Sequence, residues 1–184
     1  LSPFFVPCIL THTTMEPVLA IENLSKSFGA NHVLQNINME LFRGESIAIL
    51  GKSGIGKSVL AKCIVRLFEP DAGFIKIFGK DLLTATETEL ASLRQKVGYL
   101  FQGSALYDSM SVRENLEFAL RYAPFAHSQS DVDELVMEAL TNVGLKDTIN
   151  SMPAELSGGM RKRLGLARTL ISKPEIILYD EPTT

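Results

Sequence analysis

The 184-residue chain has few cysteines, few histidines, no excess of basic residues and no long apolar run. Its two cysteines, Cys8 and Cys63, are too few for a disulfide framework and fit a reducing compartment. A net charge of −3 argues against a large nucleic-acid interface, so we expect no nucleic-acid partner. His12, His32 and His127 lack the spacing of metal ligands. No apolar run approaches the roughly 20 residues that a membrane-spanning helix requires.

The chain is long enough for one domain with a proper core, since 46% of its residues are hydrophobic and 21% are charged. Clear strand character begins at Met15. The preceding residues 1–14 are apolar but contain two prolines and no basic flank, so they fit a signal peptide poorly. We expect them to be a disordered extension that cloning or the choice of start site added. A genuine disordered arm is the alternative.

Three segments near the N-terminus predict an antiparallel sheet. Two of them span residues 18–28 and 74–79. The third, "INMELF", alternates Ile37, Met39 and Leu41 with polar residues, as a strand with one buried face does.

A second group of segments predicts a buried parallel sheet. "ESIAIL" (45–50) is short, apolar and followed by glycines, as a buried parallel strand should be. "KVGYLFQ" (96–102) and "EIILYDE" (175–181) have the same character. Between the first two, residues 57–68 predict a helix. Its apolar face consists of Val59, Leu60, Cys63, Ile64 and Leu67.

The sequence between the last two of these strands predicts a mostly helical insert. "SVRE", from Ser111 to Glu114, has the form of a capping box that begins a helix. "DVDELVMEALTNVG" repeats apolar residues on one helical face and ends at Gly144, which favours a helix stop there. The prediction is therefore an α/β fold in which a helical subdomain interrupts a parallel core.

"GKSGIGKS", from Gly51 to Ser58, matches the phosphate-binding pattern G-x-x-x-x-G-K-[ST]. Glycines allow backbone N–H groups to turn toward phosphates, and the following helix adds its positive N-terminal end. Lys57 can reach the β- and γ-phosphates, and the Ser58 hydroxyl can bind Mg²⁺. A glycine turn with a surface lysine is the structural alternative. The predicted strand before the loop and the helix after it favour phosphate binding.

Two adjacent acids, Asp180 and Glu181, follow the apolar segment 176–179. In P-loop proteins an acid at the end of such a strand holds Mg²⁺, usually through water. A second carboxylate beside it can orient or deprotonate the attacking water. A solvated strand end is the alternative, but the phosphate loop favours the functional interpretation.

A third motif indicates a family. "LSGGM" (156–160), followed by "RKRLGLARTLISKP", resembles the LSGGQ signature of ABC ATPases. Gln102, at the end of "YLFQ", resembles their Q-loop, and Phe28 resembles the aromatic residue that stacks on adenine. The motifs also occur in the family's order, and the resemblance covers about residues 17–184.

The resemblance implies a P-loop NTPase fold with a RecA-like parallel sheet core, an antiparallel β subdomain and a helical subdomain. The ABC ATP-binding domain would span 15–184, with the helical subdomain at about 103–165. Glu181 would be the catalytic base, assisted by Gln102 and Lys57. Mg²⁺ would be bound by Ser58, Gln102 and Asp180. ATP would contact Phe28, Gly51, Lys52, Ser53, Gly54, Ile55, Gly56, Lys57, Ser58 and Val59 in one subunit, and Ser157, Gly158 and Gly159 in another.

The chain departs from the family pattern in two ways. Met160 replaces the last residue of the signature, which is usually Gln. The family also continues after "DEPTT" with a Gly-Leu-Asp segment, a switch histidine and the last core strands. We therefore expect the chain to be C-terminally truncated and, by itself, a weak or inactive ATPase.

The expected function is ATP binding and hydrolysis in the nucleotide-binding subunit of an ABC transporter. In the family, two such subunits close head to tail over two ATP molecules, so a homodimer is expected. The other expected partner is an integral-membrane permease, which would hold the subunit peripherally at the cytoplasmic face of the inner membrane.

Three phrases, "GSALYDSMSVRENL", "LSGGMRKRLGLAR" and "YDEPTT", resemble the Mce/Mla-type systems, which move phospholipids or other hydrophobic molecules. Leu106 and Tyr107 would then form part of the groove that receives the permease. Two alternatives remain: a soluble ABC ATPase that acts on ribosomes or DNA, and a nucleotide-binding fragment that does not hydrolyse ATP.

Overall fold

The structure, a computed structural model, describes most of the chain: residues 16–101, 103, 105–121, 123 and 128–180. The chain divides into two compact units, Leu1–Leu93 and Arg94–Thr184, each of which is described by itself. The expected extension at 1–14 lies outside the described residues. Within the described part, no helix is long and apolar enough to cross a bilayer.

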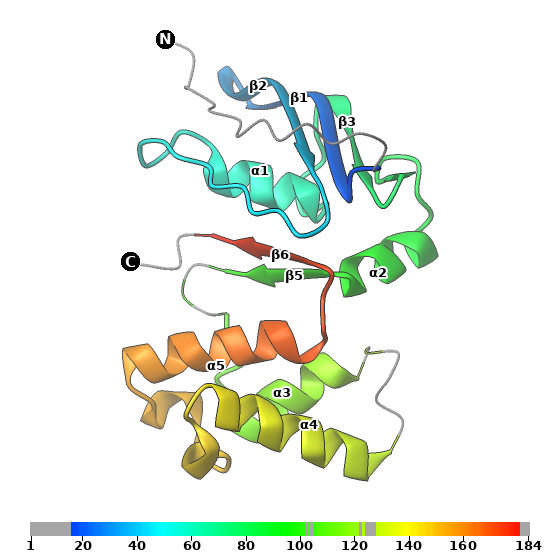
Figure 1. The fold of residues 1–184 in the computed structure, drawn as a ribbon. Helices are drawn as coiled ribbons and strands as arrows, with labels where there is room; N and C mark the ends of the chain where they lie inside the picture. Colours follow the sequence, from blue (N-terminus) through cyan, green and yellow to red (C-terminus); the bar gives the residue numbers. More distant parts are fainter. Residues whose placement is uncertain (1–15, 102, 104, 122, 124–127, 181–184) are drawn as a thin grey trace. The chain divides into compact units, whose positions relative to one another are not determined.

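The first unit contains a four-stranded antiparallel sheet with the strand order β2-β1-β3-β4 (Figure 1). The strands are β1 (Leu19–Phe28), β2 (Asn31–Leu41), β3 (Ala72–Ile77) and β4 (Lys80–Asp81). Ile21 of β1 lies opposite Met39 of β2 and Ile75 of β3, and all three side chains are buried. The predicted antiparallel sheet is therefore confirmed.

β1 and β2 form a tight hairpin whose last pair is Phe28 with Asn31. Gly29, in the two-residue turn, has a φ of 60°, which a glycine adopts without strain. β2 therefore begins at Asn31 rather than at Ile37, because backbone pairing through the hairpin does not require alternating side chains.

β1 and β3 approach closely at Gly73, which has a φ of 83°. A Cβ atom at this position would lie 2.4 Å from the carbonyl oxygen of Glu22 and 2.5 Å from the carbonyl carbon of Asn23. The register of the β1–β3 pair shifts between Glu22 and Ser25, and Asn23 itself has a φ of 51°. Only glycine fits opposite this irregularity.

Helix α1 (Lys57–Ile64) buries Leu60, Cys63 and Ile64, as predicted, but it ends four residues before the predicted end at 68. The N–H groups of Arg66 and Leu67 bond back to the carbonyls of Cys63 and Lys62, at 2.9 and 2.8 Å. This is a Schellman ending in which Arg66 has a φ of 52°, so no glycine marks the stop in the sequence. Leu67 is 54% exposed, and its predicted burial is wrong.

Residues 45–50, predicted as a buried parallel strand, form no strand in the structure. Leu50 is 82% exposed, and Ile47 and Ile49 are each 38% exposed. A parallel strand requires hydrogen-bonded neighbours and cover on both faces. Within the described residues, no backbone hydrogen bond joins 46–50 to another strand. The apolar composition of residues 45–50 suits burial, but these residues pair with no strand in the described part of the chain. The prediction of a buried parallel strand at 45–50 is therefore wrong.

The second unit combines a parallel strand pair with a layer of helices (Figure 1). β5 (Val97–Leu100) pairs in parallel with β6 (Ile176–Tyr179), as predicted. The helical elements are α3 (Val112–Leu120), α4 (Gln129–Asn142), α5 (Gly158–Ile171) and two short 3₁₀ turns, η1 (Lys146–Thr148) and η2 (Pro153–Glu155). Another helix, α2 (Glu87–Gln95), spans the boundary between the two units.

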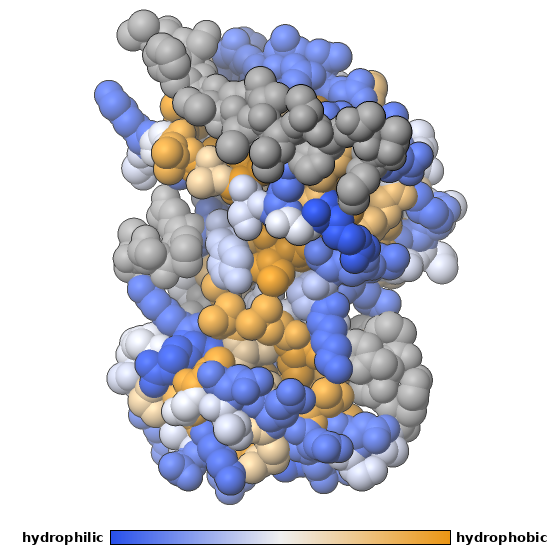
Figure 2. Space-filling view, viewed as in Figure 1, coloured by the Kyte–Doolittle hydropathy of each residue, from blue (hydrophilic) through white to orange (hydrophobic). Residues whose placement is uncertain are grey.

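α5 packs directly against β5. A Cβ atom at Gly98 of β5 would lie 2.8 Å from Cγ2 of Thr169 and 2.9 Å from Cγ of Pro174. On its other side, α5 meets α3 and α4 (Figure 1). The surface over α4 in the space-filling view is mostly hydrophilic (Figure 2). The apolar residues of α4 are buried on its other side, in a cluster with residues of α5.

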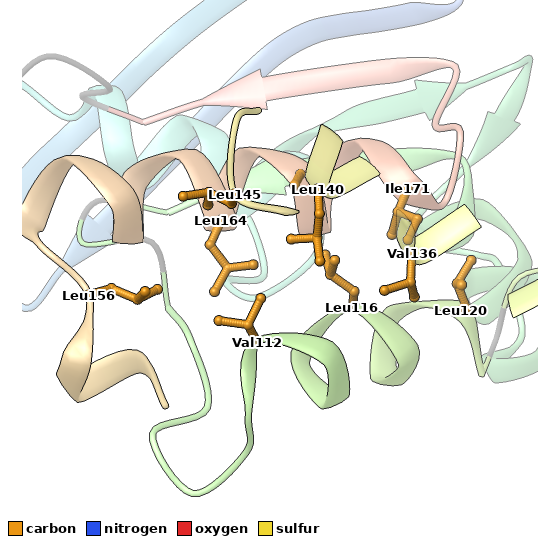
Figure 3. Packing of buried hydrophobic residues seen from close by; sticks show 10 residues of the cluster. Val112, Leu116, Leu120, Val136, Leu140, Leu145, Leu156, Leu164 and Ile171 are labelled. Atoms are coloured by element: carbon orange, nitrogen blue, oxygen red, sulfur yellow. The ribbon is translucent and has the colours of Figure 1, made fainter. Parts of the chain in front are cut away.

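The core of the second unit gathers aliphatic side chains from α3, α4, α5 and the segment between α4 and α5, and they point toward one another (Figure 3). The buried members are Val112, Leu116, Leu120, Val136, Leu140, Leu145, Leu156, Leu164, Ala167 and Ile171. We call this set the helical core.

The ends of the helices follow the predicted signals. Ser111 and Glu114 form the predicted capping box at the start of α3, with hydrogen bonds in both directions. α4 is closed two residues after Asn142 by Gly144, which has a φ of 67°, in a Schellman motif. Its two closing bonds run from the N–H of Gly144 to Thr141 and from that of Leu145 to Leu140.

Candidate nucleotide-binding site

The phosphate loop, Gly51–Ser58, leads directly into the first turn of α1. Gly54 and Gly56 have φ angles of 80° and 109°, values that side chains larger than hydrogen disfavour. A Cβ atom at Gly56 would also lie 2.8 Å from Cγ1 of Val33, so the loop packs closely on β2. Residues 51–55 are exposed. The loop therefore presents its backbone to solvent at the positive end of a helix.

The side chain of Lys57 folds over the loop. Its Nζ atom donates hydrogen bonds to the carbonyl oxygens of Gly51, at 2.9 Å, and Lys52, at 3.1 Å. Ser58 and Val59, the next residues of α1, are half-buried. An ammonium group and a helix N-terminus thus meet at one exposed loop, which is the arrangement that binds a polyphosphate.

Phe28, at the end of β1, presents a partly exposed ring. The ring is 43% exposed and meets Phe68 edge to face, with 5.3 Å between centroids and an interplanar angle of 72°. The Nζ atom of Lys26 lies 5.5 Å from the Phe28 centroid. An aromatic ring held in this way can stack on a base.

Asp180 follows β6 and is 8% exposed. Its N–H donates to the carbonyl of Leu100, at 3.1 Å, and its Oδ2 accepts a hydrogen bond from the Tyr99 hydroxyl, at 3.0 Å. Burial, together with the hydrogen bond to Asp180, raises the pKa of Tyr99 above its usual value, so the hydroxyl stays protonated as a donor. The donor types fit Mg²⁺, since the Asp180 carboxylate and the Ser58 hydroxyl both offer oxygen.

The signature motif lies at the start of α5. Ser157 is the N-cap, and its hydroxyl accepts a hydrogen bond from the N–H of Met160, at 3.2 Å. Gly158 and Gly159 are exposed, and a Cβ atom at Gly158 would meet no atom of the described residues within 4 Å. Met160 is partly buried and packs against the helical core. The two glycines therefore form an open helix N-terminus.

Asn115 of α3 is fully buried and joins this helix to the segment 107–111 that precedes it. Its Oδ1 accepts from the N–H of Tyr107, at 2.9 Å. Its Nδ2 donates to the carbonyls of Tyr107, Met110 and Ser111, at 3.1, 3.0 and 3.0 Å. The buried amide therefore fixes the segment 107–111 to α3.

The predicted site residues fall into two groups. Phe28 and the phosphate loop Gly51–Val59 belong to the first unit, whereas Asp180 and Ser157–Gly159 belong to the second. Gln102 and Glu181 lie outside the described residues. The sequence motifs do not reveal the polar partners of these groups: Lys26, Asp71, Tyr99, Asn115 and Arg168. Lys26, Asp71 and Tyr99 act through contacts 44 or more positions apart, for which no local pattern exists. Asn115 bonds residues four to eight positions before it, but no motif marks it.

Comparisons with known proteins assign the family. The sequence profile described as ABC transporter matches residues 34–184. The chain belongs to the ABC transporter family. The match includes the phosphate loop, the signature motif and the acidic end of β6, which the family's ATP-binding domain carries.

Two curated relatives and one solved structure illustrate the similarity. Protein TRIGALACTOSYLDIACYLGLYCEROL 3, chloroplastic, from Arabidopsis thaliana is 41% identical, over 90% of this chain and 50% of that protein. A probable ribonucleotide transport ATP-binding protein, mkl, from Mycobacterium leprae is 40% identical, over 91% of this chain and 48% of that protein. The chain thus spans about half the length of these relatives.

The solved structure is a dimeric ATP-binding cassette in a post-hydrolysis state, bound to ADP and Pi. It superposes with a TM-score of 0.81 at 31% identity, covering 90% of this chain and 74% of that one. The P-loop NTPase fold predicted for the ABC ATP-binding domain is therefore confirmed.

Proposed function

We propose that the protein is the ATP-hydrolysing subunit of an ABC transporter. The observation that carries the proposal is Lys57, whose ammonium group bonds the carbonyls of its own phosphate loop. On binding, the β- and γ-phosphate oxygens of ATP would replace these carbonyls as partners of Lys57. The exposed ring of Phe28 would stack on the adenine.

Hydrolysis would use groups of the phosphate loop and groups at the ends of the predicted strands 96–102 and 175–181. Ser58 and Asp180 would bind Mg²⁺ together with Gln102, and the metal would neutralise charge on the phosphates. Glu181 would orient or deprotonate the attacking water. Tyr99 supports this role, because its hydroxyl donates a hydrogen bond that orients the Asp180 carboxylate.

A second subunit would complete the site. Ser157, Gly158 and Gly159 would contact the γ-phosphate of the ATP that the other subunit holds. Their exposure at the N-terminus of α5 supports this contact. Among the described residues, no atom lies within 4 Å of the position that a Cβ atom of residue 158 would take, so a phosphate can approach. The similar solved structure is itself described as dimeric.

The permease would contact the second unit beside Tyr107. This ring is 42% exposed and lies 4.8 Å from the Phe118 ring and 5.3 Å from the guanidinium carbon of Arg168. Nη1 of Arg168 is buried and has no hydrogen-bond partner within the described residues. Burial lowers the pKa of this guanidinium.

The proposed cargo is a phospholipid or another hydrophobic molecule, and the proposed location is the cytoplasmic face of the inner membrane. The lipid assignment rests on the resemblance to Mce/Mla-type systems. The name of the Arabidopsis relative includes the name of a glycerolipid, which supports the lipid assignment. The name of the mycobacterial relative mentions ribonucleotides instead.

A soluble ABC ATPase and a non-hydrolysing nucleotide-binding fragment are the competing functions. Cofractionation of the whole protein with membranes separates the first of these from a transporter subunit. Loss from the membrane fraction when the permease gene is deleted would support the transporter assignment, and a distribution that ignores the permease would contradict it.

Two variants test the chemistry. In the whole protein, Glu181→Gln should bind ATP with unchanged affinity but hydrolyse it at least about 100-fold more slowly, because general base catalysis contributes about that much. Lys57→Ala should weaken ATP binding itself. Lys146→Ala, at an exposed lysine of η1, serves as the control and should match the wild type. Full turnover by Glu181→Gln would refute the assigned role.

A third variant tests the permease surface. Tyr107→Glu should reduce copurification of the permease while ATP binding persists, because a charge would replace the exposed ring. Met152→Glu changes a residue of similar exposure, 37%, and should leave copurification unchanged. Equal recovery of the permease with both variants would exclude Tyr107 from the interface.

A further inference from the structure

Asp71 holds the end of β1 at two adjacent residues. Its Oδ1 accepts a hydrogen bond from Nζ of Lys26, at 2.7 Å, and its Oδ2 accepts one from the backbone N–H of Ser27, at 2.6 Å. The N–H of Asp71 in turn donates to the carbonyl of Ser25, at 2.9 Å. Three consecutive residues before Phe28 are thus bonded to one residue of the loop that precedes β3.

These bonds fix the backbone and the lysine side chain that lie next to the ring of Phe28. The Lys26 side chain is only 16% exposed, and its ammonium lies 5.5 Å from the Phe28 centroid. Phe68 adds an edge-to-face contact at 5.3 Å. Lys26 and Phe68 both contact the ring, and 43% of Phe28 remains exposed beside them.

Two hydrogen bonds favour the ionised form of the Asp71 carboxylate. The hydrogen bond from Lys26 and then the one from Ser27 hold the pKa of Asp71 below its usual value. Lys26 therefore has a permanent counter-ion that holds its ammonium group in place beside the ring.

We propose that Asp71 is a positioning residue for the base of the nucleotide. It orients Phe28 through Lys26 and Ser27, so that the exposed part of the ring can stack on a purine. This inference rests on the proposed nucleotide-binding function. It assigns Asp71 no contact with the nucleotide, and it separates recognition of the base from recognition of the phosphates.

The separation follows from the hydrogen bonds of the first unit. The contacts of Lys57 with Gly51 and Lys52 include neither Asp71 nor Lys26. Loss of the Asp71 contacts should therefore weaken binding of ATP but not of a ligand that carries the phosphates alone. A merely structural role would weaken both ligands alike.

The test compares ATP with tripolyphosphate, both with Mg²⁺, by titration calorimetry on the whole protein. Base stacking on an aromatic residue is worth roughly a factor of ten or more in affinity, so Phe28→Ala should weaken ATP binding by about tenfold. Asp71→Asn should weaken it by about threefold to fivefold, a part of the same stacking effect. Both variants should bind tripolyphosphate within about twofold of the wild type, since the phosphate contacts are separate.

Lys26→Met, which removes the ion pair but leaves the Ser27 bond available, keeps the test valid if Asp71→Asn folds poorly. It should also weaken ATP binding selectively. Asp147→Asn, at an exposed aspartate of η1, is the matched control and should change neither ligand.

The possible results separate the two proposals. If Phe28→Ala weakens ATP selectively while Asp71→Asn and Lys26→Met do not, the positioning role is overturned and the nucleotide site stands. Equal weakening of both ligands by Asp71→Asn also overturns the positioning role. If the wild type binds neither ligand, the proposed function itself fails.

Discussion

The hydroxyl of Tyr99 donates a 3.0 Å hydrogen bond to Oδ2 of Asp180, which links two residues that lie 81 positions apart in the sequence. The parallel pairing of β5 with β6 brings the two strand ends together, with Leu100 opposite Tyr179. The acid proposed to bind Mg²⁺ is therefore oriented by a neighbouring strand.

Tyr99→Phe should weaken the use of Mg²⁺. The variant removes only the hydroxyl, and a hydrogen bond to a charged group contributes about 1.5 kcal/mol or more, so the Mg²⁺ concentration for half-maximal ATP hydrolysis should rise about tenfold. Tyr179→Phe removes a hydroxyl from a side chain that is 52% exposed and should behave as the wild type. Identical Mg²⁺ titrations for the two variants would show that Tyr99 does not position Asp180.

Asn115→Ala should destabilise the protein by about 3 kcal/mol, because it removes a fully buried amide that bonds the N–H of Tyr107 and the carbonyl of Met110. The measurement is chemical denaturation followed by circular dichroism. Asn150→Ala, at an exposed asparagine, should change the free energy of unfolding by less than about 0.5 kcal/mol. A small effect at both positions would mean that water replaces the Asn115 amide.

Gly73→Ala should be far more destabilising than Gly79→Ala. Both glycines have positive φ angles, 83° and 75°, so both substitutions introduce backbone strain of about 1 kcal/mol. Only at Gly73 would the new Cβ lie 2.4 Å from a carbonyl oxygen, whereas Gly79 has nothing within 4 Å. Thermal unfolding should therefore show a loss of more than about 3 kcal/mol for Gly73→Ala alone. Equal losses would mean that β1 moves away without cost.

Glu89 should contribute pH-dependent stability at acid pH. The N–H of Thr86, followed by Lys80, lowers the pKa of the Glu89 carboxyl from 4.5 to about 2. The unfolded state therefore binds a proton more readily than the folded state, so this contribution is complete above pH 4.5 and is lost as the pH falls toward 2.

Urea denaturation of Glu89→Gln and the wild type between pH 6 and about pH 2 tests this prediction. The difference in the free energy of unfolding should shrink as the pH falls. Glu87→Gln, at a neighbouring exposed acid in α2, should show no such convergence. A difference that stays constant from pH 6 downward would exclude Glu89 as the source.

Much of the fold could be predicted because its signals are local. The capping box at Ser111 and the glycine stop at Gly144 depend on residues within one turn of a helix, and the alternation of Ile37 to Leu41 depends on one strand. The end of α1 could not be predicted, because Arg66 occupies a left-handed position that normally favours glycine. The strand predicted at 45–50 failed for another reason: hydrophobicity alone does not provide a neighbouring strand.

The candidate site shows the same division. The motif at Gly51–Ser58 predicted the loop because its chemistry depends on residues that are consecutive in sequence. The residues that hold the other groups in place, such as Tyr99 and Asp71, were missed because folding alone brings them to their partners. Asp71 belongs to no motif of the sequence, yet its carboxylate bonds two residues of β1.

Met160 has a mechanical consequence for the signature motif. Its side chain packs against the helical core, directly after the exposed Gly158 and Gly159. Ser157 caps the same turn through the N–H of Met160. The first turn of α5 is thus anchored to α3 and α4 by a close-packed interior, which transmits displacement instead of absorbing it. We therefore expect a shift of α3 or α4 to displace the two glycines as well.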